Sequence, residues 1–211
     1  SSKGEKAIHI IEEYRKMNKN LPFSRKKNLK TLNYHPKLKL DYFEKIDTKE
    51  KAYWLGFLWA EVYLGKRGEI KLELNKKDEI LINRFCKAIG LNLKYKKYIK
   101  KQRKKGTQIY VRIRFRNSKI QDDLYKLGYI KSKMRSSIFP DLDNRELDLS
   151  FLLGFFDGDG KEGKNVLHIG SKKILEEIKE KFVVPHDILT DKRGYYRLSL
   201  GGKLFNSMMR N

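Results

Sequence analysis

Two carboxylates end two apolar segments that share the same glycine spacing. In residues 54–61 (WLGFLWAE) and 152–160 (LLGFFDGDG), a glycine lies five positions before an acid. A helix with glycine on one face is thin enough there for a second helix to approach closely. Helices that meet through Gly56 and Gly154 would therefore bring Glu61 and Asp159 side by side at their ends.

Paired carboxylates of this kind are suited to divalent metals. Two like charges at close range repel each other unless a cation lies between them. Carboxylate oxygens suit Mg²⁺ or Mn²⁺, and acids with bound metals are a standard means of hydrolysing phosphodiesters. One apolar helix that ends in an acid is most often an ordinary core helix, but a second copy with the same spacing favours a shared site. We therefore expect Glu61 and Asp159 to be catalytic residues that bind Mg²⁺ or Mn²⁺.

Positive charge dominates the composition of the chain. The 211 residues include 49 Lys and Arg against 26 Asp and Glu, which gives a formal net charge of +23. Solubility alone requires far less charge, so a polyanion is the expected partner. A generally basic protein of the ribosomal type is the alternative, but it does not explain where the charge lies.

The basic residues are concentrated in residues 94–116. Their first half contains only lysine and arginine as charged residues, and Gly106 indicates a hairpin turn. The second half alternates apolar and polar residues, which is the periodicity of a strand. Its polar residues are Tyr110, Arg112, Arg114 and Arg116. This face is either simply solvated or part of a β-ribbon that lies in a DNA major groove and contacts phosphates and base edges.

The remaining periodicities predict an α+β fold. Strands are expected over 70–75, 166–169 and 195–200, and helices over 79–90, 118–127, 174–182 and 203–209. We expect two pseudo-symmetric α-β-β-α-β-β-α repeats that form an antiparallel β saddle, with the two motif helices packed at its centre. The expected domains are a basic helical extension (1–46), a first repeat (47–140) and a second, shorter repeat (141–211).

The two motifs resemble those of the LAGLIDADG homing endonucleases, in the single-chain form that carries both motifs as a pseudo-dimer. The resemblance extends over residues 43–211, because residues 43–56 and 139–141 are similar to segments that commonly lead into the family's motifs. The second motif matches closely, whereas the first has Glu61 for the commoner aspartate and Val62 for the final glycine. That glycine ends the helix in a conformation that a β-branched residue disfavours, so we expect strain at Val62.

The resemblance implies a monomeric, site-specific, intron-encoded endonuclease that cleaves double-stranded DNA. Glu61 and Asp159 would hold divalent metals at the scissile phosphates, one strand for each acid. Lysines beside the metals would balance the charge of the transition state. The candidates are Lys76 and Lys172, each beginning a helix after its strand, and Lys161, two residues after Asp159. The alternative is a non-cleaving relative, an RNA maturase or a DNA-binding regulator, which Val62 favours and the two acids oppose.

Outward residues of the expected strands complete the candidate DNA interface. Arg197 occupies the place in the second repeat that three arginines occupy in the first, so we expect the second half-site to be read less stringently. The candidate DNA contacts are Lys71, Glu73, Asn75, Lys94, Lys96, Tyr110, Arg112, Arg114, Arg116, His168, Tyr195, Arg197 and Ser199.

Other functional classes lack their characteristic residues. Cys86 is the only cysteine, so neither a cysteine zinc site nor a disulfide framework is available. The four histidines form no catalytic or metal-binding pattern, and no glycine-rich phosphate loop occurs. No apolar run is long enough for a signal peptide or a membrane span, so we expect an intracellular protein without membrane contact.

Overall fold

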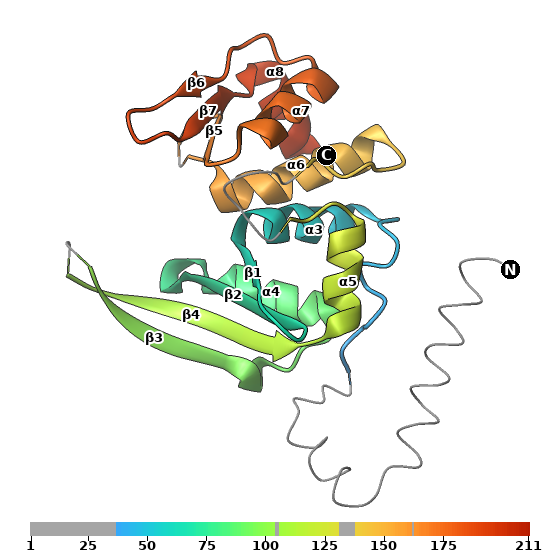
Figure 1. The fold of residues 1–211 in the computed structure, drawn as a ribbon, viewed down its shortest axis with the longest axis vertical. Helices are drawn as coiled ribbons and strands as arrows, with labels where there is room; N and C mark the ends of the chain where they lie inside the picture. The colour runs from blue at the N-terminus through green and yellow to red at the C-terminus, as the bar shows by residue number, and fades with distance from the viewer. Residues whose placement is uncertain (1–36, 104–105, 131–137, 162) are drawn as a thin grey trace, which may run out of the picture. The chain divides into compact units, whose positions relative to one another are not determined.

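Two antiparallel β-sheets and a central pair of helices make up the part of the chain that the computed structural model describes, residues 37–103, 106–130, 138–161 and 163–211 (Figure 1). Residues 37–211 form one compact unit. Of the extension expected over 1–46, residues 1–36 lie outside the described residues. Residues 37–46 belong to the core, to which they contribute Phe43 and Ile46.

The described residues have a mixed α/β fold. In chain order, the elements are α3 (Lys49–Glu61), β1 (Val62–Leu64), β2 (Glu69–Asn75), the 3₁₀ turn η1 (Lys76–Asp78), α4 (Glu79–Ile89), the 3₁₀ turn η2 (Leu93–Tyr95), β3 (Lys96–Arg103), β4 (Gly106–Arg116), α5 (Ser118–Lys126), α6 (Arg145–Asp159), β5 (Val166–Ile169), α7 (Lys172–Phe182), β6 (Leu189–Thr190), β7 (Tyr196–Ser199) and α8 (Gly201–Arg210). The helices expected from periodicity are confirmed as α4, α5, α7 and α8. The predicted order α-β-β-α-β-β-α agrees with α3 to α5, but no residue ranges were predicted for two short strands, β1 and β6.

The helices α3 and α6 lie side by side at the centre (Figure 1). Every residue of α3 from Trp54 to Ala60 is buried, as expected for a helix that is apolar on all sides. Side-chain oxygens cap the start of both helices. Thr48 accepts a hydrogen bond from the Lys51 N–H (3.2 Å), and Asn144 accepts from the N–H groups of Glu146 and Leu147 (3.0 Å each).

The first sheet has the strand order β1-β2-β4-β3, and each neighbouring pair is antiparallel. Burial alternates along β2 and β4, so each strand has one apolar and one polar face. On the apolar face, Leu72 lies opposite Ile113, and the helices α4 and α5 contact β2. The polar side of the sheet, opposite this apolar face, is called the open face below. It contains Glu73 opposite Arg112 and Lys71 opposite Arg114.

The second sheet is smaller and has the order β5-β7-β6. Leu167 pairs with Leu198 on its buried face, and His168 pairs with Arg197 on the other. An isolated bridge joins Gly160, the residue after α6, to Leu167. The chain therefore returns to pair with a sheet directly after α6, as it does in β1 after α3.

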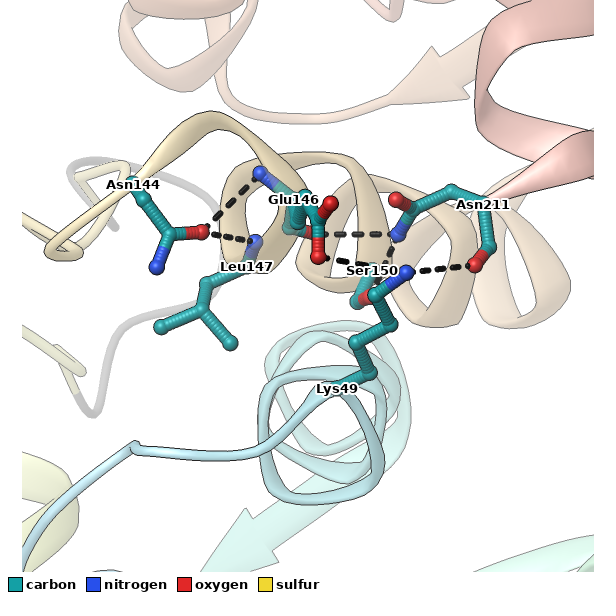
Figure 2. A network of polar contacts seen from close by, with 6 residues as sticks. All are labelled: Lys49, Asn144, Glu146, Leu147, Ser150 and Asn211. Atoms are coloured by element: carbon teal, nitrogen blue, oxygen red, sulfur yellow. Dashed lines mark hydrogen bonds and ion pairs between the residues drawn. The ribbon is translucent and has the colours of Figure 1, made fainter.

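A polar network joins α3, α6 and the end of α8 (Figure 2). The side-chain amide of Asn211 donates to the Glu146 carbonyl (2.8 Å) and to Ser150 Oγ (2.7 Å). Lys49 Nζ donates to the Asn211 carbonyl (2.9 Å) and forms an ion pair with Glu146 (3.3 Å). Because Ser150 is 4% exposed, its hydrogen bond lies in the least solvated part of the network.

Replacing Ser150 by alanine is expected to lower the free energy of unfolding by about 1 kcal/mol, because a partly buried hydrogen bond is lost. Urea unfolding of the full chain measures this change. Ser207→Ala is the matched control. Ser207 is an exposed α8 residue whose hydroxyl donates to the Lys203 carbonyl of its own helix, so its replacement should stay within about 0.5 kcal/mol of the wild type. Equal losses in the two variants would contradict a stabilising role for the network.

Candidate active site and nucleic-acid interface

The two motif glycines each lie against the backbone of the opposite helix. A Cβ atom on Gly56 would lie 1.9 Å from the carbonyl oxygen of Phe151, and one on Gly154 would lie 1.9 Å from the carbonyl oxygen of Tyr53. The two contacts are reciprocal, since each glycine meets the residue three positions before the other. The expected close approach of the helices through Gly56 and Gly154 is therefore confirmed, and no side chain fits at either position.

This packing continues to the carboxyl ends of both helices. A Cβ atom on Gly158 would lie 2.3 Å from Ala60 Cβ and 3.2 Å from Glu61 Cγ. The Glu61 side chain therefore lies against Gly158 in the last turn of α6, the residue that precedes Asp159 in the sequence. Glu61 is the last residue of α3, Asp159 is the last residue of α6, and both are half-buried.

The electrostatics of these helix ends favour a cation. The carboxyl end of a helix carries partial negative charge, which disfavours an acid there and favours a positive group. Neither α3 nor α6 has a basic residue in its last turn. Within the described residues, no three His, Cys, Asp or Glu side chains gather in a metal-binding group. Two carboxylates fit Mg²⁺ nevertheless, because this ion retains several waters and takes further ligands from substrate phosphates.

The expected strain at Val62 is wrong. Val62 has φ −76° and ψ 143°, and Gly160, the residue that follows the second acid, has φ −74° and ψ 153°. Both residues are extended, and an extended backbone is favourable for a β-branched residue. Val62 is buried and begins β1. The valine is therefore accommodated without a left-handed backbone at this helix end.

The other acid of the second motif, Asp157, contributes to the contact between the helices. Its Oδ2 accepts a hydrogen bond of 2.6 Å from the Tyr53 hydroxyl. Burial raises the pKa of Asp157, although the hydrogen bond from Tyr53 acts in the opposite direction. Asp157 therefore joins α6 to α3 two residues before the helix end, whereas Asp159 lies at the end itself.

The three candidate lysines occupy different surroundings, and their role stays a prediction. Lys76 begins η1 at the end of β2, with its Nζ 5.8 Å from the centroid of the Tyr98 ring. Lys172 begins α7 and forms an ion pair with Glu176 of the same helix (2.7 Å). Lys161 is exposed, and its backbone N–H donates to the Val166 carbonyl (2.9 Å).

The open face of the first sheet carries carboxylates among its cations. Glu73 Oε2 accepts from Arg112 Nε (2.6 Å), and Glu73 also forms an ion pair with Lys101 of β3. Glu69 pairs with Arg114 (2.5 Å). The sequence contained the signal for these pairs, because acids alternate with lysine along residues 69–75. Only the structure, however, shows which arginine each acid contacts: Glu73 pairs with Arg112 directly opposite it, whereas Glu69 pairs with Arg114 and not with Arg116 opposite it.

The remaining candidates of the first sheet lie partly off the open face. Lys96 shares the side of the buried Ile113 and is ion-paired with Glu79 of α4. Lys94 lies in η2, where its N–H donates to Asn92 (2.9 Å). Three residues keep places on the open face. Lys71 Nζ lies 4.4 Å from the Tyr63 ring, the Tyr110 hydroxyl donates to Gln108 (2.9 Å), and Asn75 Oδ1 accepts from the Lys77 N–H (3.1 Å).

In the second sheet, Asp191 connects the candidate residues, and sequence reasoning missed it. Its Oδ2 lies 3.0 Å from His168 Nε2 and 3.6 Å from Arg197 Nη2. Burial opposes ionisation of Asp191, but hydrogen bonds from the N–H groups of Tyr195 and Arg193 and from His168 outweigh it, so the pKa is well below its usual value. The Tyr195 ring packs against His168, with ring centroids 5.5 Å apart. Ser199 lies opposite Val166.

The amino-acid sequence matches no known protein family. No family model matches the chain, and no curated protein matches it. Among solved structures, one from work on mesophilic variants of the homing endonuclease I-DmoI is 19% identical and has a TM-score of 0.47. The match covers 75% of this chain and 92% of that one. None of the helices in the described ranges is both long and apolar enough to cross a membrane.

Proposed function

We propose that the chain is a site-specific endonuclease that hydrolyses both strands of a DNA duplex with divalent metals bound at Glu61 and Asp159. The observation that carries this proposal is the shared end of α3 and α6. Two carboxylates lie there at helix ends that attract a cation, and the helices are held together by glycines that admit no side chain. The net charge of +23 supports a polyanionic substrate.

The proposed reaction is metal-assisted phosphodiester hydrolysis, with one acid for each strand. Glu61 and Asp159 would hold Mg²⁺ or Mn²⁺ through their carboxylate oxygens. When bound, such ions supply Lewis-acid activation of the scissile phosphate and of the attacking water. The candidate lysines Lys76, Lys161 and Lys172 would balance negative charge that develops in the transition state. The roles of the lysines rest on the resemblance of the two motifs to those of the LAGLIDADG homing endonucleases.

The two sheets would contact the DNA unequally. The strand β4 has 11 residues and carries three arginines, whereas β7 has four residues and carries Arg197. The first sheet can therefore follow a groove over a longer distance than the second. We propose that the half-site read by the first sheet is the more stringent one and that a monomer contacts both half-sites.

The alternative remains a non-cleaving relative, either an RNA maturase or a DNA-binding regulator. The sequence feature in its favour was Val62 in place of the motif's glycine. The extended backbone of Val62 matches that of Gly160, so this residue gives no reason to expect an inactive first half. The retained acids at both helix ends favour cleavage.

Incubation of the full chain and Mg²⁺ with a randomised duplex library, followed by sequencing of the cleaved ends, tests the proposal. Because a strongly basic protein binds any DNA, cleavage is more informative than binding. We expect both strands to be cut within one long sequence, with tighter base preference on one side of the cut. The same reaction with EDTA is the control and should give no product. Binding without cleavage in Mg²⁺ and in Mn²⁺ would favour the alternative.

A further inference from the structure

We infer that Glu73 is a positioning residue that sets base specificity by holding Arg112 on the open face of the first sheet. The inference rests on the proposed function, because it assigns Arg112 to a DNA base edge. It concerns how DNA is read and is independent of the metal site.

The contact between Glu73 and Arg112 fixes one edge of the guanidinium group. Glu73 Oε2 accepts from Arg112 Nε at 2.6 Å and also forms an ion pair with Nη2. This is the side-on edge of the group. The end-on edge, formed by the outer N–H groups of Nη1 and Nη2, is not used in this contact. An end-on pair of N–H groups matches the O6 and N7 acceptors of guanine.

Lys101 holds Glu73 from the other side. Its Nζ forms an ion pair with Glu73 Oε1 and lies 4.8 Å from the centroid of the Tyr110 ring. The Glu73 side chain is 15% exposed, compared with 32% for Arg112 and for Lys101. Burial opposes ionisation of Glu73, but the hydrogen bonds from Lys101 and Arg112 outweigh it and lower the pKa of the carboxyl group. Glu73 is therefore ionised at neutral pH.

A carboxylate is an unexpected group on a face that binds phosphates, because its charge repels the DNA backbone. An arginine without a fixed partner can contact any phosphate, whereas one held side-on presents its free edge in a single direction. Arg116 of the same strand provides the comparison, since it is exposed and Glu69, which lies opposite it, pairs with Arg114 instead. The carboxylate thus reduces affinity for all DNA and raises the selectivity of one arginine. A specific binder is expected to have lower overall affinity in exchange for better discrimination between sequences.

The test compares Glu73→Gln with Glu79→Gln by selection from the randomised library through binding, in buffer without divalent metal. Glu79 is the matched control because it also pairs with a lysine, Lys96, and a further donor, the Tyr98 hydroxyl. It lies on α4 and not on the open face. Both variants lose one negative charge, so both should bind random duplex slightly more tightly. Only Glu73→Gln should lose preference for guanine at one position, by about tenfold.

A double-mutant cycle with Arg112→Ala separates positioning from a structural role. Arg112→Ala should remove the same guanine preference, and adding Glu73→Gln to it should cause no further change at that position. The inference fails if Glu73→Gln leaves the base profile intact, or if it weakens every position equally. If the wild type selects no sequence, the proposed function fails as well. If it selects a sequence but does not cleave it, only the nuclease proposal fails.

Discussion

Replacing Asp159 by asparagine is expected to abolish cleavage of at least one DNA strand while DNA affinity changes little. The substitution keeps the shape of the side chain but removes an anionic ligand at the end of α6. Loss of metal-assisted charge stabilisation amounts to several kcal/mol, so the rate should fall by about 10²-fold or more. Glu61→Gln should have the same effect on the other strand. Supercoiled plasmid with the selected site measures both results, because cutting one strand gives nicked circles and cutting both gives linear DNA.

Asp157→Asn is the control for this pair of variants. Asp157 belongs to the same motif, two residues before Asp159, but its carboxylate accepts the Tyr53 hydroxyl hydrogen bond between the helices. Its replacement should reduce stability modestly and leave both strands cleavable. Normal cleavage in Mg²⁺ by both Asp159→Asn and Glu61→Gln would show that the active site lies elsewhere. If only Asp157→Asn lost cleavage, Asp157 and not Asp159 would be the catalytic acid of the second motif.

The parts of the fold that depend on local pattern were predictable from the sequence. Alternation over residues 70–75 and 109–116 corresponds to β2 and β4, and helical spacing corresponds to α4 and α7. The glycine spacing predicted the close approach of α3 and α6, because a glycine within an apolar helical face marks a position where a backbone approaches. These signals lie within a few neighbouring residues, so one sequence is sufficient to detect them.

The parts that depend on register or on short elements were not predictable. The strand β6 has two residues, which is too few to show a period. The pairing of Glu73 with Arg112 joins residues 39 positions apart, and only the alignment of β2 with β4 reveals it. Asp191 lies in the loop between β6 and β7 and contacts His168 of β5, 23 residues earlier in the sequence. At Val62, residue type alone predicted strain, because the backbone angles of the helix end were not known.

Replacing Gly154 by alanine is expected to destabilise the protein by about 1–3 kcal/mol or more, and leucine should be worse. The added Cβ would lie 1.9 Å from the Tyr53 carbonyl oxygen and 2.9 Å from the Phe57 nitrogen, and both are backbone atoms that cannot rotate away. Gly56→Ala should cost a similar amount, since its Cβ would meet Phe151 in the same way. Urea unfolding of the full chain measures both losses.

The control for the glycine variants is a glycine whose replacement should not lower the free energy of unfolding. Gly202 lies within α8, and a Cβ atom there would meet nothing within 4 Å. Gly202→Ala should therefore leave stability unchanged or raise it by up to about 1 kcal/mol, because alanine is the better helix former.

The Gly56 and Gly154 variants must also separate the helix ends that carry Glu61 and Asp159, so cleavage of both strands should fall together. Wild-type stability in Gly154→Ala would show that α3 and α6 do not pack through these glycines, and the assignment of a shared site would fail with it.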